Sequence, residues 1–462
     1  MEQIRKENKM GVEPVGSLLI KMSFPMMLSM LVMALYNVVD SVFVSRVSED
    51  ALTAVSLAFP FQMLITSVGV GTAVGVNSLV ARRLGEGRQP DANCAASHGL
   101  YLALLSALVF TIAYIAFARP ALALFAEGDI AVLDMSVSYL TICGGLCAFS
   151  MMAIMTEKIL QGTGDTFHAM VIQLVGALTN IVLDPIMIFG YLGFPALGVA
   201  GAALATVIGQ LVSMITGFYI LFARNKLISI RIRGFRFRKE TVGNIYRVGL
   251  PSIVMQAIGS VTTFGLNKIL MMFSKTAVSV LGVYFKLQSF VFMPVFGLNS
   301  GAMPIMAFNY GARDKERVMK TLKLSALYAL IIMCVGLALF QAIPDKFLLL
   351  FDASDHMLDI GTHAFRVISL CFPFAALGIM FSSLYQAVGI GIYSLLVSLA
   401  RQLIVILPAA YVLAVTAGLD AVWFAYPIAE CLSMIISAAL VVFVYRKYIR
   451  NLQKTPETQE IA

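Results

Sequence analysis

Two aspartates lie inside long apolar segments of the chain, where an ionisable side chain could bind and release a small cation. Asp40 lies six residues before Arg46, and Asp184 lies six residues before Gly190 at the end of another apolar segment. At a rise of about 1.5 Å per residue, both carboxyl groups reach a similar depth if the two segments are membrane-crossing helices. Charged groups are costly in hydrocarbon, so two acids at one depth indicate a functional site.

Further polar or small residues lie close enough along these helices to join the two carboxyl groups. The residues expected at this depth are Asn37, Asn180, Ala202 and Thr206. Burial disfavours a charged carboxylate, and two neighbouring carboxylates oppose each other's ionisation. The cluster therefore favours either a proton taken up by the acids or a sodium ion held by Asp40 and Asp184. The alternative is a local role, in which each aspartate caps or pairs its own helix beside a break such as Pro185.

The composition predicts the elements that position these residues. Hydrophobic residues make up 60% of the 462 positions and charged residues only 13%, about half the charged share of a soluble domain. Apolar windows long enough for a membrane span of roughly 20 residues recur along the chain. We predict an all-α polytopic membrane protein with twelve transmembrane helices. They lie at 17–44, 52–80, 94–118, 135–157, 167–190, 197–223, 248–273, 277–308, 320–343, 362–387, 392–416 and 421–445.

The chain repeats itself with a shift of 226 residues. The matched pairs are Pro25 and Pro251, Ala51 and Ala277, Phe59 and Phe285, Gln62 and Gln288, Gly71 and Gly297, Gly75 and Gly301, and Gly85 and Gly311. Six spans per copy give both copies the same orientation, so we predict two six-helix bundles related by a pseudo-twofold axis along the membrane normal. Such a duplicated bundle is the usual frame of a secondary transporter. The predicted parts are an N-terminal lobe 1–223, a basic cytoplasmic linker 224–247, a C-terminal lobe 248–450 and a polar tail 451–462.

Basic residues predict the orientation in the membrane. The even-numbered connections and both tails hold most of the lysines and arginines, including the dense run 224–239, while the opposite loops are acidic. This asymmetry places both termini in the cytoplasm. It also accounts for the net charge of +8, because the excess basic residues lie on the cytoplasmic side of the lipid bilayer and no nucleic acid is needed to explain them. The alternative for 224–239 is a basic arm that binds nucleic acid. We expect a multi-pass monomer in the inner membrane of a prokaryotic cell.

The sequence carries no pattern for a cofactor or for enzymatic catalysis. Cys143 and Cys147 lie one helical turn apart without a histidine cluster, which makes a poor metal site. The glycines at 69, 71 and 75 follow no strand, and no phosphate-binding lysine follows a glycine-rich loop, so neither a dinucleotide site nor an ATP-driven motor is expected. The chain is predicted not to be an enzyme, with a proton or sodium ion as its only cofactor-like requirement.

The second half carries different charges from the first. Its intramembrane ionisable residues are Lys268, Lys286, Arg366, Arg401 and Glu430. Arg401 and Glu430 are interpreted as a pair between spans eleven and twelve, and Lys268 and Arg366 as side chains that snorkel to the interface. Gln62, Gln288 and Lys286 are the expected lining of a central substrate cleft, with packing between helices as the alternative for the glutamines.

The chain resembles the MATE (multidrug and toxic compound extrusion) transporters over essentially its whole length. The residues that carry the resemblance are 24–25 (FP), Asp40, 85–87 (GEG), 161–166 (QGTGDT), 180–185 (NIVLDP), 198–206 (GVAGAALAT) and 309–313 (NYGAR). The resemblance implies cation-driven efflux of bulky, often cationic or amphipathic compounds by alternating access. It also implies that Asp40, Asn180, Asp184 and Thr206 form a cation site and that Pro25 is associated with bending of span one.

One branch of that family has acidic residues in spans seven and ten, and this sequence lacks them. By the repeat, Asp40 corresponds to Leu266, and aligning Pro185 with Pro408 makes Asp184 correspond to Leu407. We therefore predict cation:drug antiport that is coupled in the first half only. The alternatives are a flippase for lipid-linked precursors from the same superfamily, which requires a basic cavity for a phosphate, and an intramembrane enzyme, which requires a catalytic cluster.

Overall fold

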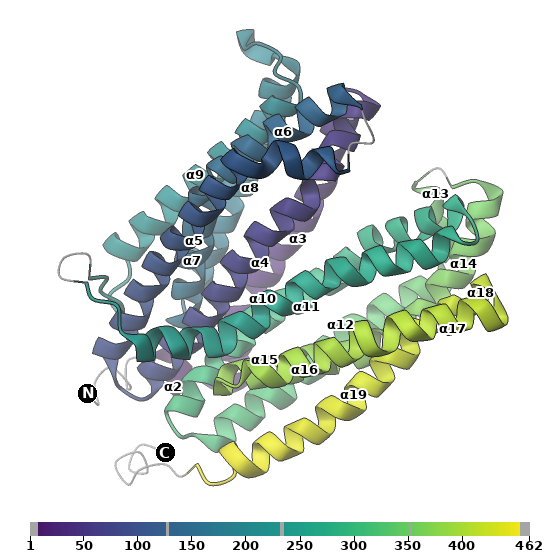
Figure 1. Cartoon of the computed structure of the whole chain (residues 1–462). Coiled ribbons are helices and arrows are strands. Elements are labelled where there is room, and N and C mark those ends of the chain that lie inside the picture. Colours follow the sequence, from purple (N-terminus) through teal and green to yellow (C-terminus); the bar gives the residue numbers. More distant parts are fainter. Residues whose placement is uncertain (1–7, 126–128, 232–234, 352, 453–462) are drawn as a thin grey trace. The chain divides into compact units, whose positions relative to one another are not determined.

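The computed structural model describes residues 8–125, 129–231, 235–351 and 353–452, and within these ranges the chain is helical without a β-strand (Figure 1). Helices satisfy the backbone hydrogen bonds inside one segment, which is what an apolar surrounding demands. The predicted all-α class is confirmed. The predicted polar tail lies almost wholly outside the described residues.

Most helices follow one another with short connections, whereas a longer loop joins α9 to α10 (Figure 1). The first half contains α2 (Lys9–Val12), α3 (Val15–Ser45), α4 (Glu49–Gly85), α5 (Gln89–Ala123), α6 (Ile130–Gly145), α7 (Ala148–Gly162), α8 (Thr166–Phe189), the 3₁₀ turn η1 (Tyr191–Gly193) and α9 (Val199–Ala223). The second half contains α10 (Lys239–Met271), α11 (Lys275–Gly311), α12 (Lys315–Ala342), α13 (Pro344–Leu349), α14 (Asp355–Ser369), α15 (Phe372–Val388), α16 (Gly391–Leu399), the π-helix η2 (Ala400–Ile406), α17 (Leu407–Ala417), α18 (Leu419–Val422), α19 (Ala425–Val444) and the π-helix η3 (Tyr445–Ile449).

Ten spans are long and apolar enough to cross a membrane, and two more consist of bent helix pairs. The pair α6 and α7 bends by 46°, and so does the pair α14 and α15. With each pair taken as one span, the described residues hold up to 12 spans, which confirms the predicted number and order. The predicted spans 135–157 and 362–387 both run across one of these bends, which hydropathy did not reveal.

Packing divides the chain into two units whose limits lie inside helices. The first unit is Leu28–Ile253, and the second combines Glu2–Met27 with Val254–Ala462. Met27 and Ile253, the residues before the two limits, are 226 positions apart, the same shift that relates the two sequence copies. Each unit therefore contains the beginning of the other copy's first span. The predicted lobe limits at 223 and 248, which follow polarity along the chain, stay a prediction.

Glycines at matched positions of the repeat pack against these exchanged segments within each unit. In the first unit, a Cβ at Gly71 of α4 would lie 2.7 Å from the backbone nitrogen of Ile253, and one at Gly75 would overlap the Ile245 carbonyl oxygen. In the second unit, a Cβ at Gly297 would lie 2.5 Å from Met27 Cα, and one at Gly301 would lie 2.8 Å from Ser23 Cα. Backbone approach this close requires glycine on one side, so the repeat preserves two equivalent contacts.

The basic loop after α9 is tied to α5 within the first unit. The Asn93 side-chain oxygen accepts from Ser229 N at 2.9 Å, and His98 Nε2 accepts from Arg238 N at 2.8 Å. The ring of Phe235 stacks on Tyr101 with centroids 3.9 Å apart. The described part of the predicted linker is thus an ordered covering of α5 that ends where α10 begins at Lys239.

Candidate functional site

The two predicted aspartates face each other between α3 and α8. The carboxyl groups of Asp40 and Asp184 lie within hydrogen-bonding reach of one another. The rings of Phe43 and Phe189, near the ends of the same two helices, meet edge to face with centroids 6.4 Å apart. Asp184 is fully buried, whereas Asp40 is partly exposed. Helical depth in the sequence therefore predicted a real juxtaposition.

Asn180 connects Asp184 to α9. Asn180 lies one turn before Asp184 on α8. Its amide nitrogen and its amide oxygen both have hydrogen-bond partners when the nitrogen faces the Asp184 carboxylate. In that orientation the nitrogen donates to Asp184 Oδ2 at 2.8 Å, and the oxygen accepts from Thr206 N at 2.9 Å and from Thr206 Oγ1 at 3.1 Å. The four residues Asp40, Asn180, Asp184 and Thr206 thus form one connected group.

Tyr36 belongs to the same group, although its sequence position was not singled out. It hydrogen bonds to Thr206 and lies one helical turn before Asp40 on α3. The i, i+4 spacing to Asp40 is the signal that could have identified it. The Tyr36 hydroxyl therefore connects α3 to Thr206 on α9.

A second layer of polar side chains reaches the site from α4 and α6. Gln62 hydrogen bonds to Tyr139 and to Cys143, and both lie near Asp40. Gln62 thus lies beside the acidic group of the first unit, and its predicted place in the lining of a substrate cleft stays a prediction. Sequence spacing offers no signal for Tyr139 and Cys143, because they lie on a helix distant in sequence from both aspartates.

One oxygen of the acidic pair has no hydrogen-bond donor. Asp184 Oδ1 is buried without a partner among the residues that the structure describes. Ionised carboxylates only accept hydrogen bonds, so two of them can bond to each other only when one carries a proton. Within the described ranges, the ion pairs formed by lysine, arginine or histidine include neither Asp40 nor Asp184. The arrangement therefore favours a bound proton or small cation.

The remaining predicted site residues lie in varied places. Ala202 is buried on α9 one turn before Thr206, and Asn37 is exposed on α3. Pro25 lies inside α3, in the part that belongs to the second unit. Lys286 is exposed, with Nζ 5.9 Å from the centre of the Phe351 ring. No group of three or more His, Cys, Asp or Glu residues suited to a metal ion occurs in the described part of the chain.

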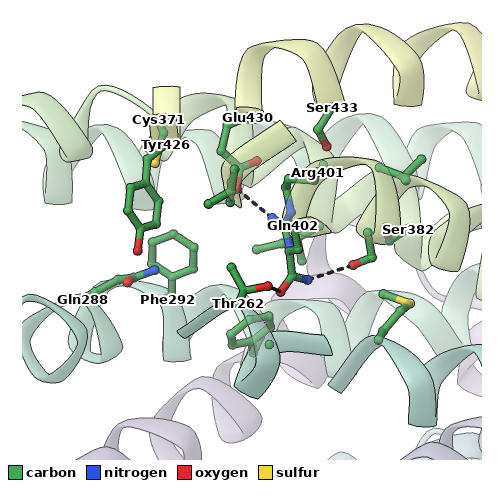
Figure 2. A pocket seen from close by; sticks show the side chains of 18 of the residues that line it. Thr262, Gln288, Phe292, Cys371, Ser382, Arg401, Gln402, Tyr426, Glu430 and Ser433 are labelled. Carbon is green, nitrogen blue, oxygen red and sulfur yellow. Dashed lines mark hydrogen bonds and ion pairs between the residues drawn. The ribbon is translucent and has the colours of Figure 1, made fainter. Parts of the chain in front are cut away.

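The second unit contains a cavity of about 550 Å³ among α10, α11, α15, η2 and α19. In Figure 2, Gln288, Phe292 and Tyr426 lie on one side of Arg401, Gln402 and Glu430 in the lining of this cavity. Arg401 Nη1 donates to Glu430 Oε1 at 2.7 Å, which confirms the predicted pair between spans eleven and twelve. Of the four basic residues in the second-half spans, Arg401 lines the cavity, whereas Lys268, Lys286 and Arg366 are exposed.

Comparisons with known proteins follow the same repeat. The model of the MatE family matches residues 25–186 and again 251–412, two stretches offset by 226 positions. The chain is 25% identical over 424 residues to the "FAD transporter" of Shewanella oneidensis, covering 91% of this chain and 92% of that protein. It is also 25% identical over 436 residues to the "Multidrug export protein MepA" of Staphylococcus aureus, with 94% of each chain covered.

Solved structures agree with these relatives along nearly the full length. The crystal structure of MATE in complex with MaD3S has a TM-score of 0.90 at 28% identity, covering 97% of this chain and 99% of that chain. A MOP superfamily transporter from Pyrococcus furiosus, described as having a binding pocket of reverse polarity, has a TM-score of 0.89 at 26% identity with coverage of 96% and 99%. Because the family model matches well over half of the residues, the chain belongs to the MatE family of membrane transporters.

Proposed function

We propose that the protein is a secondary active multidrug efflux transporter that exchanges external protons for bulky cationic or amphipathic compounds. Membership of a transporter family and similarity to a protein named for multidrug export support the class of activity. The acidic group of the first unit supports the coupling. The chain is accordingly a carrier rather than an enzyme, and it needs an ion gradient in place of a cofactor.

The observation that carries this proposal is the unpartnered oxygen of Asp184 beside Asp40. A proton on either carboxyl group would supply the missing donor and remove the repulsion between two ionised acids. A sodium ion would need several oxygen ligands, but the Asn180 oxygen is already engaged by Thr206 and its nitrogen faces Asp184. The hydrogen-bond directions therefore support a proton over sodium.

Exchange follows if proton and drug stabilise different states of the protein. A ligand shifts a two-state equilibrium only by the difference between its affinities for the two states. Loss of the proton leaves the buried Asp184 carboxylate beside Asp40 without a compensating charge, which disfavours whichever state keeps the pair closed. Protonation from outside would thus favour the state that has released its drug, and deprotonation inside would favour the state that binds drug again.

Transport in everted membrane vesicles tests the proposal. A pH gradient and a sodium gradient are imposed separately, and the accumulation of a cationic dye is followed by fluorescence. The wild type should respond to the pH gradient, and Asp40→Asn should lose the response while its amount in the membrane is unchanged. Asp134→Asn is the matched control, because Asp134 is an exposed acid paired with Arg119 on the surface.

Two results would contradict the proposal in different parts. Dye transport driven by sodium alone would show that the ion is wrong, and undiminished transport by Asp40→Asn would show that the site is wrong.

Both termini are proposed to be cytoplasmic, with the protein a monomer in the cytoplasmic membrane. Reporter fusions at each end and the mass of the purified protein in detergent check these assignments.

A further inference from the structure

The cavity of the second unit is lined by a guanidinium that is only partly used. Arg401 has five N–H donors. Among the described residues, it makes one hydrogen bond, to Glu430. The Arg401 side chain is 28% exposed, whereas the Glu430 side chain is 10% exposed. The arginine is therefore the more exposed member of the pair, and both residues line the cavity.

A π-helix presents this arginine together with its neighbour. Arg401 and Gln402 both belong to η2 (Ala400–Ile406), and both line the cavity. Its hydrogen bonds run from residue i to i+5, and π-helical turns are rare and occur frequently at functional sites. Gln402 is held on both sides, since its Oε1 accepts from Thr262 at 3.4 Å and its Nε2 donates to Ser398 at 3.3 Å. The fixed glutamine leaves Arg401 as the charged donor of the cavity, whose wall also holds Gln288 Oε1 and Asn299 Oδ1, both unpartnered among the described residues.

The walls of the cavity suit a flat apolar body. Phe285, Phe292, Phe296 and Tyr426 line it together with Tyr284 (Figure 2 labels Phe292 and Tyr426). Its volume of about 550 Å³ lies within the range of small-molecule sites, roughly 300–1,000 Å³. The Tyr426 hydroxyl, also in the cavity wall, has no hydrogen-bond partner among the described residues. Aromatic walls around one charged donor set define a ligand with an aromatic body and an anionic group.

We propose that this cavity is a binding site for aromatic carboxylates, with the carboxylate on Arg401 and the ring between the phenylalanines. A planar guanidinium binds a carboxylate through two parallel N–H bonds and matches its geometry better than an ammonium does. Glu430 balances Arg401 when the cavity holds no ligand and keeps it oriented from the less exposed side. The proposal goes beyond proton coupling in the first unit, because it assigns a ligand class to a different unit.

Three probes with one ring system test the charge preference directly. Binding of 1-naphthoate, 1-naphthamide and 1-naphthylmethylammonium to the purified full-length protein in detergent is measured by isothermal titration calorimetry. We expect naphthoate to bind at least tenfold more tightly than the amide and the ammonium. Equal affinities for the three probes, or a preference for the ammonium, which would then compete with Arg401 for Glu430, would overturn the proposal.

Substitutions locate the binding. Arg401→Gln combined with Glu430→Gln removes both charges without leaving a buried charge alone, and it should reduce naphthoate affinity to that of naphthamide. Arg401→Lys keeps the charge but loses the two-pronged geometry, and we expect an intermediate loss of several-fold. If the double variant does not elute as a folded protein, the Arg401→Lys titration decides, and unchanged affinity there contradicts the proposal.

Controls separate this site from the coupling site. Lys268→Gln removes an exposed lysine whose Nζ lies 5.2 Å from the Phe264 ring centre, and it should bind naphthoate like the wild type. Asp40→Asn should also retain naphthoate binding although it loses proton-driven dye transport. Loss of naphthoate affinity in Asp40→Asn would assign the ligand to the first unit and contradict the proposal, whatever the outcome for coupling.

Discussion

In the first unit Asp40 and Asp184 lie together with an amide and hydroxyl groups and no basic side chain among their described partners, whereas in the second unit Glu430 lies against Arg401. Both are buried acidic sites on corresponding scaffolds. An acid already paired with arginine gains little from taking up a proton, while two unpaired acids require one. The difference is the reason why the proposed proton exchange is assigned to the first unit alone.

The corresponding position in the second unit shows what replaced the acidic pair. Asp40 corresponds to Leu266 and Asp184 to Leu407, and a Cβ on the adjacent Gly265 would lie 2.7 Å from Leu407 Cδ2. The two helices therefore still meet at this point, with apolar packing in place of carboxyl groups. Leu266 also lines the cavity that holds Arg401. The charged pair of the second unit, Arg401 and Glu430, lies instead in spans eleven and twelve.

The largest effect should follow from removing the second acid of the first unit. Asp184→Asn is expected to reduce proton-driven dye transport by about two orders of magnitude, because removing one member of a unit that acts together loses the function of the whole. Asp40→Asn combined with Asp184→Asn should be no worse than either single change. Transport in vesicles measures both, and an additive loss would mean that the acids act independently.

Removing one partner of the Arg401–Glu430 pair in the second unit should lower the free energy of unfolding. Arg401→Gln leaves Glu430 as a buried unpaired charge and is expected to cost about 3 kcal/mol of unfolding free energy, the lower end for broken buried pairs because the arginine is partly exposed. Arg401→Gln with Glu430→Gln should be less destabilised than the single variant. Thermal unfolding in detergent measures the order, and the reverse order would show that the pair is not compensating buried charge.

The two exchanged helix contacts should respond alike. Gly75→Ala and Gly301→Ala each place a methyl group against backbone atoms, of Ile245 and Ser23 respectively, and should cost about 1–3 kcal/mol of stability. Gly282→Ala is the control, since nothing lies within 4 Å of a Cβ there, and it should stabilise α11 by about 0.5–1 kcal/mol. A large loss in only one of the two glycine variants would show that the contacts are not equivalent.

The smallest effect concerns the support of the acidic pair. Thr206→Val removes the hydroxyl that bonds to the Asn180 oxygen and to Tyr36, while the Thr206 backbone N–H keeps its bond to the Asn180 oxygen. A net loss of about 1 kcal/mol corresponds to roughly a fivefold lower rate of proton-driven transport. Thr206→Ser should restore the rate. Equal loss in both variants would attribute the effect to packing of the methyl group instead of the hydroxyl.

Much of this architecture could be predicted from the sequence. Apolar length located twelve spans, and helical depth brought Asp40, Asp184, Asn180 and Thr206 to one place, because a helix converts residue number into depth. The predicted Arg401–Glu430 pair formed for the same reason: one basic and one acidic residue in adjacent spans cannot both remain alone in hydrocarbon.

The features that were missed depend on packing between helices distant in sequence. Tyr139 and Cys143 join the first site through α6, and no spacing rule relates α6 to α3 or α4. The bends at Leu146 and Leu370 interrupt continuous apolar runs, so hydropathy passed over them. The π-helix at Arg401 has ordinary helix-forming residues, and its extra width is a backbone property that composition does not encode.

The exchange of helix beginnings between the units has a mechanical consequence. The described chain passes from one unit to the other only twice, after Met27 in α3 and after Ile253 in α10. Pro25 and Pro251 each lie two residues before such a passage, inside the helix, where proline removes a backbone hydrogen bond and weakens resistance to bending. The described part of the basic loop at 224–238 lies within the first unit and contains neither passage. The chain therefore connects the two units within two continuous helices, and we propose the two prolines as matched points of bending.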